Sequence, residues 1–405
     1  MAEPNLNDRL KRFGQHISSD RKASASSPSR YAKLADAVNG ELVHTPSGSF
    51  VIVKTTYPAT HFHGSVLLED VIPSTTYPLS AFTAHDDPGQ VTPSNLLFLD
   101  TETTGLGGTG TVPFLIGFGR VKGSTFEVTQ LLIPDYSDET AMLETLLEEI
   151  PPETTFVTYN GGAFDIPLLR DRVIINRVAR DFASRNGHID LLHPTRRLFK
   201  RRIKDCSLVN AEQQLFGFFR QSDIPGYLIP AIYFDWLTSE DSSQMPGVLE
   251  HNRLDILSLH FLMAHIHRVF LTEGDSLRAG EDLYSLSRVY RRRSHHHKAL
   301  KICDRIEQEH PEITAEMRLF HAQTLKKVGD WPRAVSVWEQ LAPTDSREGY
   351  WANVELAKYF EHRVQDYPRA VTHAKSALRT CPYSKSEKER LTHRLQRLTS
   401  KQSNS

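Results

Sequence analysis

Cysteine is scarce in this chain, and long hydrophobic runs are absent. The three cysteines, Cys206, Cys303 and Cys381, lie far apart and form no Cys-x-x-Cys pair, so neither a disulfide framework nor a cysteine zinc site is indicated. No run of about 18 apolar residues occurs, and residues 1–15 lack the apolar segment of a secretory signal. We therefore expect a cytoplasmic protein that neither spans nor binds a membrane.

The chain also lacks an excess of charge of either sign. Its 48 basic and 49 acidic side chains give a formal net charge of −1, so any nucleic-acid contact must come from a local basic patch. The motif G-x-x-x-x-G-K-[ST] does not occur, which argues against a P-loop helicase. A length of 405 residues predicts two or three domains.

The sequence pattern divides the chain into five parts. Residues 1–40 are polar and serine-rich and predict a flexible arm, in which one short helix could form. Residues 41–94 begin with a hairpin pattern and end in turns, which predicts a small β-rich subdomain. Residues 95–272 alternate strand and helix patterns and predict a mixed α/β sheet. The expected strands cover 95–100, 111–121, 126–134 and 154–159, and the expected helices cover 139–150 and 164–182.

Three similar segments follow residue 280. Ala299, Ala334 and Ala370 align with spacings of 35 and 36 residues, close to the ~34 residues of a tetratricopeptide repeat. Each segment over 280–384 would be a helix pair with a small alanine where the two helices touch. An unrelated helical bundle is the alternative. Residues 385–405 are polar, and we expect them to fray.

The first chemical motif is FLDTETTG, in which Asp100 and Glu102 end an apolar strand. Positions i and i+2 of a strand share a face, so the two carboxylates would project together and repel each other. A hard divalent cation such as Mg²⁺ would remove the repulsion, because it prefers oxygen ligands. A solvated strand end is the alternative.

Two further motifs supply acids and a histidine. In YNGGAFDIPLL, Asp165 follows a glycine turn and enters the first turn of a helix, where it could also simply favour the helix dipole. In HNRLDILSL, His251 and Asp255 are four residues apart and share one helix face. Leu254, Leu257 and Phe261 are expected to form an apolar stripe toward the sheet.

Four carboxylates and one imidazole suit phosphodiester hydrolysis. Two metal ions about 3.5–4 Å apart can stabilise the attacking and the leaving oxygen, and about four carboxylates are needed to hold them. Asp100, Glu102, Asp165 and Asp255 are the predicted metal ligands. His251 is the candidate for orienting or deprotonating the water, because the imidazole side chain as a residue type has a pKa near 6.5.

The three motifs resemble the exonuclease motifs of the DEDD superfamily, and residues 188–237 resemble the YprB-like ribonuclease-H-like family. The resemblance covers about residues 95–270, and the family's trailing tetratricopeptide-like region fits 280–382. It implies a ribonuclease-H-like mixed sheet with flanking helices and a 3′→5′ exonuclease using Mg²⁺ or Mn²⁺. A DNA-repair role beside a helicase partner would follow. His251 has the register of the tyrosine subclass and the residue type of the histidine subclass, so its role as base or water-positioning group stays open.

Basic residues lie between the second and third motifs. The segment from Arg196 to Lys204 holds six basic residues in nine, a footprint for phosphates or, alternatively, a solvated helix face. Apolar side chains beside the motifs could stack on a terminal base. The predicted nucleic-acid contacts, with DNA favoured over RNA, are Leu106, Asn160, Phe164, Arg196, Arg197, Lys200, Arg201 and Arg202.

Two competing interpretations concern the glycines and the repeats. Residues 105–110 fit G-x-G-x-x-G, but a strand pattern follows where a dinucleotide site needs a helix, so a hairpin turn is favoured. Asp190 is an extra acid that either supports the site or shapes a turn. The remaining functional alternative is a binding scaffold that recruits partners through its repeats while the nuclease domain is inactive.

Overall fold

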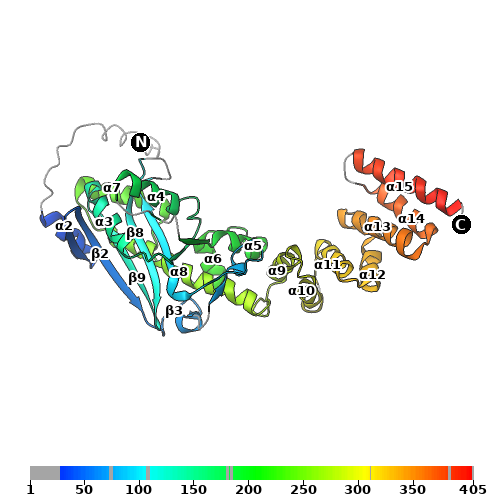
Figure 1. The fold of residues 1–405 in the computed structure, drawn as a ribbon, viewed down its shortest axis with the longest axis horizontal. Coiled ribbons are helices and arrows are strands. Elements are labelled where there is room, and N and C mark those ends of the chain that lie inside the picture. The colour runs from blue at the N-terminus through cyan, green and yellow to red at the C-terminus, as the bar shows by residue number, and fades with distance from the viewer. Residues whose placement is uncertain are drawn as a thin grey trace.

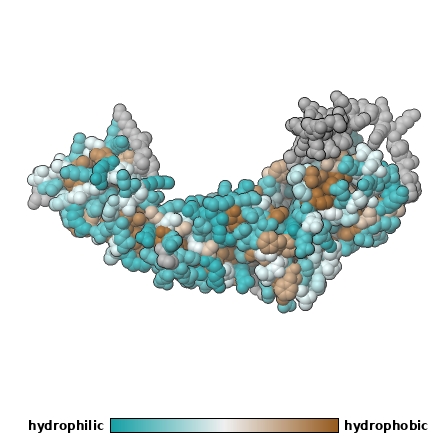
Figure 2. All heavy atoms as spheres, turned by 180° about the vertical axis from the view of Figure 1, so that it is seen from behind, coloured by the Kyte–Doolittle hydropathy of each residue, from teal (hydrophilic) through white to brown (hydrophobic). Residues whose placement is uncertain are grey.

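The computed structural model describes residues 28–72, 76–105, 110–178, 182, 186–310, 312–381 and 385–403. Figure 1 shows an α/β body from which a line of helices extends to the C-terminus. Seen from behind in Figure 2, the molecule is a curved, elongated arc, and hydrophilic residues cover most of the surface of the helical part.

A seven-stranded mixed sheet forms the centre of the body, in the order β1-β2-β9-β8-β7-β10-β11. Strand β7 pairs antiparallel with β8 and parallel with β10, and β10 pairs parallel with β11. The carboxyl ends of β7, β10 and β11 therefore lie at one edge. This confirms the predicted mixed α/β sheet. The strands are β1 (Glu41–Thr45), β2 (Gly48–Tyr57), β7 (Leu96–Thr103), β8 (Pro113–Lys122), β9 (Thr125–Leu132), β10 (Thr155–Thr158) and β11 (Gly187–Asp190).

Helices pack on both faces of the sheet, as the alternation along β7 shows. Leu97 and Leu99 belong to the apolar cluster formed with α3 (Glu139–Glu148), α4 (Asp165–Ile175) and α7 (Ile229–Ser239). Leu96 and Phe98 belong to the cluster formed with α5 (Leu192–Ile203), α6 (Leu208–Phe216) and α8 (Met245–Leu271). Because successive side chains of a strand alternate, Asp100 and Glu102 continue the Phe98 face, toward α8.

Helix α8 packs directly against β8 at two strand positions that carry no side chain. A Cβ at Gly117 would lie 2.1 Å from Asn252 Oδ1, and one at Gly119 would lie 2.7 Å from Ile256 Cγ2. Among the described helices α8 is the one long and apolar enough to cross a membrane, yet 67% of its most apolar window is buried inside the protein. We take it as the core helix of the domain.

The predicted apolar stripe of α8 is partly wrong. Leu257 and Phe261 are buried in the core as expected. The residues that meet the sheet at its glycines, however, are Asn252 and Ile256, while Leu254 lines a separate cavity. A polar residue at the point of closest approach breaks the apolar spacing on which the prediction rested.

The expected separate subdomain over residues 41–94 is not observed. Strands β1 and β2 extend the main sheet, and β2 pairs with β9 from Val51↔Leu132 to Tyr57↔Phe126. The remaining strands form two small sheets, and Tyr77 of one sheet and Leu68, just after the other, join the α8 cluster. The local sequence pattern predicts the β1–β2 hairpin, but it does not reveal that β2 pairs with β9, a strand distant in sequence. The small strands are β3 (Phe62–His63), β4 (Val66–Leu67), β5 (Tyr77–Pro78) and β6 (Gln90–Val91).

The N-terminal segment contains one short helix in its described part, and the C-terminal segment forms a helix where we expected fraying. Residues 1–27 lie outside the described part, but α2 (Pro28–Ala37) packs on the body with Leu34 fully buried. At the other end α15 (Lys385–Ser403) forms a helix with Leu391 and Leu398 buried. Sparse apolar residues at helical spacing are enough to anchor each end. The predicted helix over 164–182 is shorter than expected, since α4 ends at Ile175.

Three helix pairs follow α8. Ala299, Ala334 and Ala370 are each the fourth residue of the second helix of a pair, and each is fully buried. Their small side chains therefore lie inside the helical stack. The pairs are α9 (Gly280–Arg292) with α10 (His296–Glu309), α11 (Ala315–Val328) with α12 (Trp331–Leu341), and α13 (Arg347–Tyr359) with α14 (Tyr367–Arg379).

Candidate active site

The carboxyl end of β7 supplies the first two acids. Asp100 lies opposite Gly117 and Glu102 opposite Leu115 in the β7–β8 register, and the register shifts just after Glu102. Thr101 points to the other face, where its Oγ1 donates a 2.6 Å hydrogen bond to Asp165 Oδ1. Thr101 therefore connects the third acid to the strand that carries the first two.

A glycine turn after β10 places Asp165 at the start of α4. Asn160 adopts the left-handed backbone conformation, with φ of 66°. Asp190 at the end of β11 accepts hydrogen bonds from the backbone nitrogens of Asn160 at 2.8 Å and Gly162 at 3.2 Å. Of the two roles considered for Asp190, these contacts match the turn-shaping one, which in turn fixes where Asp165 stands.

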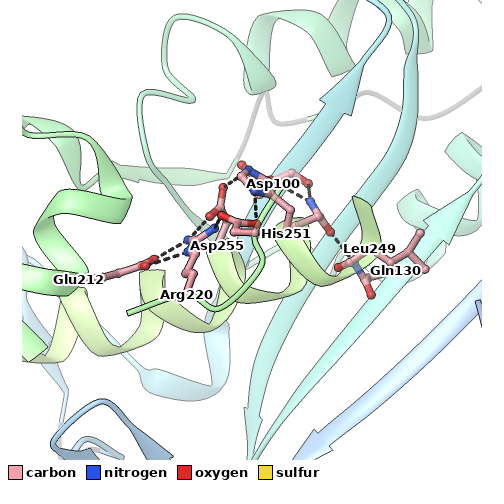
Figure 3. Close-up of polar contacts among 9 residues, drawn as sticks. Asp100, Gln130, Glu212, Arg220, Leu249, His251 and Asp255 are labelled. Atoms are coloured by element: carbon pink, nitrogen blue, oxygen red, sulfur yellow. Dashed lines mark hydrogen bonds and ion pairs between the residues drawn. The ribbon is translucent and has the colours of Figure 1, made fainter. Parts of the chain in front are cut away.

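Asn252 on α8 holds Asp100 in place, a role that the sequence analysis missed. This fully buried amide donates through Nδ2 to Asp100 Oδ2 at 2.8 Å. Its Oδ1 accepts from Gln130 Nε2 at 2.8 Å, and the same nitrogen donates to the Leu249 carbonyl. Figure 3 shows this chain of contacts running from β9 through α8 to Asp100. The available signal was the position of Asn252, directly after His251 and four residues before Ile256 on the same helix face.

Arg220 and Asp223, in the loop between α6 and α7, complete the site, and the sequence analysis missed both. The Arg220 side chain is only 2% exposed and pairs with Glu212, Asp223 and Asp255. Asp223 Oδ1 lies 2.8 Å from His251 Nδ1. One cation thus organises both the last acid and the partner of the histidine (Figure 3). No periodic pattern marks this loop, so spacing could not have found it.

The Asp223 contact fixes the hydrogen on the His251 ring. A carboxylate can only accept, so Nδ1–H donates to Asp223, and Nε2 of the neutral ring is left as an acceptor. Nε2 lies 3.6 Å from Asp255 Oδ2, too far for a hydrogen bond. A virtual Cβ on Gly226 would lie 3.8 Å from the same nitrogen, so the segment bearing the exposed Tyr227 borders the histidine.

The acids influence one another strongly. Burial, and then the charges of Asp255, Glu102 and Asp165, raise the pKa of Asp100 well above its ordinary value. Burial and the charges of Asp255 and Asp165 do the same to the pKa of Glu102. Burial also raises the pKa of Asp165, to about 6. The structure therefore brings the four predicted acids into one electrostatic group beside His251.

This donor set fits hard divalent cations. All four groups offer carboxylate oxygens, the ligands that Mg²⁺ prefers, and a bound cation would relieve the repulsion that raises their pKa values. No three of their ligand atoms lie within 4.8 Å of one another, so the four acids do not form a compact single-ion cluster.

The one described group of three ligand atoms within 4.8 Å lies elsewhere, between α10 and α11. Asp304 and Glu307 flank the buried His321, with Nε2 2.9 Å from Asp304 and Nδ1 3.2 Å from Glu307. The guanidinium of Arg333 also pairs with Asp304. Because both ring nitrogens and a cation already bind these acids, we take this group as an ion-pair network that joins helices.

The predicted nucleic-acid contacts divide into exposed and engaged side chains. Phe164, beside Asp165, is 50% exposed, and Arg196 and Lys200 on α5 are exposed. Leu106 lies outside the described residues. Three other cations make contacts within the chain: Arg197 to the Thr83 carbonyl at 2.6 Å, Arg201 to Glu316 at 2.9 Å and Arg202 to Asp282 at 2.8 Å.

The glycines over 105–110 have the context of a sheet connection. Residues 106–109 lie outside the described part, but the next element is the strand β8, which begins at Pro113. A dinucleotide fingerprint must open a helix. A dinucleotide site at these glycines is therefore excluded by its context.

The chain is similar to known proteins, both over its sheet domain and over most of its length. The RNase_H superfamily profile matches residues 97–267, the part that carries all five predicted catalytic residues. The uncharacterized protein YprB of Bacillus subtilis (strain 168) is 34% identical over 359 residues, covering 87% of this chain and 86% of that protein. The match thus spans the helical region as well as the sheet, and the chain belongs to the YprB family, with a ribonuclease-H-like domain.

Proposed function

We propose that this protein is a metal-dependent 3′→5′ exonuclease of the DEDD type that acts on nucleic acid, with DNA favoured. Membership in the RNase_H superfamily indicates a nuclease and hence a nucleic-acid substrate. The finer proposal rests on one observation. Asp100 is buried at the carboxyl end of β7 and held by Asn252, and burial together with the charges of the nearby Asp255, Glu102 and Asp165 raises its pKa, beside a histidine oriented by Asp223.

Each residue has a distinct task in this proposal. Asp100, Glu102, Asp165 and Asp255 would hold two Mg²⁺ or Mn²⁺ ions, which when bound stabilise charge on the attacking and leaving oxygens. His251 presents Nε2 as an acceptor for a proton of the attacking water, because its Nδ1–H is occupied by Asp223. Phe164, half exposed beside Asp165, offers a face on which a terminal base can stack.

The helical region suits a partner-binding role. Its three helix pairs, with buried alanines at 35- and 36-residue spacing, support a tetratricopeptide-like assignment. Such stacks present extended surfaces to other proteins. We propose that the region recruits a protein partner, with a helicase in DNA repair as the favoured example.

The test is degradation of labelled strands by purified protein. Single-stranded, duplex, flap and hybrid substrates are labelled at either end and incubated with Mn²⁺ or Mg²⁺. A 3′→5′ exonuclease releases a 3′ label at once and shortens a 5′-labelled strand progressively. Metal-dependent activity that disappears in Asp100→Ala excludes the scaffold alternative. Activity retained by that variant overturns the site assignment, and its absence from the wild-type protein on every substrate favours the scaffold.

A further inference from the structure

A groove lined by cations lies where the body meets the helical region. Helices α5 and α9 lie side by side there (Figure 1), and one apolar cluster includes residues of both. Between them is a cavity of about 550 Å³ with Ser285 and Val289 in its lining. The other residues that line it are His193, Arg196, Arg197, Lys200, Arg201, Arg288 and Arg292.

Most of these cations have no acidic partner. Among the described ion pairs, none involves Arg196 or Lys200 on α5, or Arg288 or Arg292 on α9. Like charges gathered around one cavity repel one another unless an anion is present. Burial and the nearby charges of Arg293 and Arg292 lower the pKa of Arg197 to about 10, which supports this electrostatic account.

The groove begins at the catalytic edge of the sheet. Its α5 wall is a stripe at positions 193, 196, 197, 200 and 201, which share one helix face. At the start of this stripe His193 Nε2 lies 3.9 Å from Asp190 Oδ2. Asp190 in turn holds the glycine turn that leads to Phe164 and Asp165. At about 1.5 Å per residue the stripe runs ~12 Å from that turn toward α9.

Packing of α5 on α9 does not account for these charges. The ion pair of Arg202 with Asp282 joins α5 to α9, and Arg201 pairs with Glu316 at the start of α11. The exposed pair Arg288 and Arg292 stands four residues apart on α9 and faces the stripe across the cavity. A row of cations that starts beside the acids and continues onto another helix fits a chain of phosphates.

We propose that this groove binds the sugar–phosphate backbone of the substrate strand beyond its reacting end, and that α9 of the helical region supplies Arg288 and Arg292 to it. The inference rests on the proposed function for its substrate class. It adds a second binding site, outside the catalytic edge, to which the helical region contributes directly. The helix pairs then act in substrate binding as well as in partner recruitment.

The test is binding without hydrolysis. A fluorescent single strand of deoxythymidine is titrated into the full chain in EDTA over a range of salt concentrations. The double variant Arg288→Ala/Arg292→Ala should bind about tenfold more weakly at low salt. Its slope of log affinity against log salt should fall by about 1.4, because two phosphate contacts are lost at ~0.7 each. Lys375→Ala/Arg379→Ala, an exposed pair at the same spacing on α14, should bind as the wild-type protein does.

The second wall provides an independent variant. Arg196→Ala/Lys200→Ala on α5 should show the same loss, and circular dichroism checks that each variant is folded. Wild-type affinity and slope in both groove variants would overturn the proposal. So would unchanged DNA binding combined with lost binding of a polyglutamate peptide, since the groove would then serve an acidic protein segment. A protein that hydrolyses nothing yet loses DNA binding in the groove variants would refute the exonuclease but keep the groove.

Discussion

Two buried acids, Glu361 in the helical region and Asp100 at the catalytic edge, have opposite partners. In the helical region Glu361 is 2% exposed and receives hydrogen bonds from Arg394 and Arg397, each at 2.6 Å. Burial raises the pKa of Glu361, but these cations outweigh it and the net pKa is lowered. At the catalytic edge burial and neighbouring acids both raise the pKa of Asp100.

The comparison separates stabilising acids from functional ones. Burial alone is common to both environments, so it does not distinguish them. What differs is the charge of the neighbours: cations satisfy Glu361, whereas Asp100 is surrounded mainly by further acids. Acidic side chains that remain close together and repel one another in the folded protein indicate a functional site. At such a site a bound cation would neutralise their charge.

The largest expected effect is on turnover, when an acid of the catalytic edge is replaced. Asp100→Asn should lower Mn²⁺-dependent exonuclease turnover by about 10³-fold or more, because losing a metal ligand removes several kcal/mol of transition-state stabilisation. The free energy of unfolding in EDTA should not fall, since one repelling charge is gone. Gel-based turnover and urea titration measure the two quantities. Glu361→Gln is the control and should retain activity; if it loses as much as Asp100→Asn, the proposed contrast fails.

Metal binding should depend on the acids of the catalytic edge and not on those of the helical region. Saturating Mn²⁺ should stabilise the wild-type protein by about 2.7 kcal/mol at a hundredfold excess over Kd. This gain should vanish in Asp100→Asn and persist in Asp304→Asn, which alters the compact group between α10 and α11. Thermal unfolding with and without Mn²⁺ reports the difference. The reverse outcome would move the metal site to the helical region.

A smaller effect is expected from the partner of the histidine. Asp223→Asn should lower kcat about ten- to a hundredfold while leaving KM nearly unchanged, because the His251 ring loses its fixed orientation but the strand still binds. Steady-state kinetics separate the two constants. Asp235→Asn, an exposed acid on α7, is the matched control. An equal loss in both variants would mean that Asp223 has no special role.

The smallest effect tests the stabilising side. Glu361→Gln should cost about 1–2 kcal/mol of unfolding free energy at pH 7, since three cations lose a charged partner. The folded pKa of Glu361 is below its ordinary 4.5, so its contribution is present above about pH 4.5 and is lost as pH falls through the folded pKa. The variant should therefore differ less from wild type at pH 3 than at pH 7. Tryptophan fluorescence follows this region, because it holds three of the four tryptophans.

Local patterns were enough for the parts of the fold that depend on local spacing. The i, i+2 relation of Asp100 and Glu102 and the glycine turn before Asp165 need only short-range geometry, and the structure places all three at one edge. The alanine spacing likewise marks the second helix of each pair. Membership of β1 and β2 in the main sheet depends on β9, about eighty residues away, and no local pattern carries that information.

The polar neighbours of the site were beyond sequence reasoning for a different reason. Arg220 and Asp223 lie in an irregular loop, so their contacts with Asp255 and His251 follow from tertiary packing alone. Arg202 shows the converse. It sits in a basic run that predicts phosphate contacts, yet its guanidinium binds the buried Asp282. A charge pattern indicates where cations are but does not reveal which acids the fold brings to them.

The glycine at position 117 has a consequence for the evolution and engineering of this protein. Because β8 carries no side chain at Gly117, helix α8, which bears His251 and Asp255, packs directly against the strand there. Gly117→Ala would push α8 away from the sheet and displace His251 and Asp255 with it. Gly117 therefore controls the position of His251 and Asp255 without itself being one of the reactive groups. We expect substitutions at position 117 to be tolerated as poorly as substitutions of the acids.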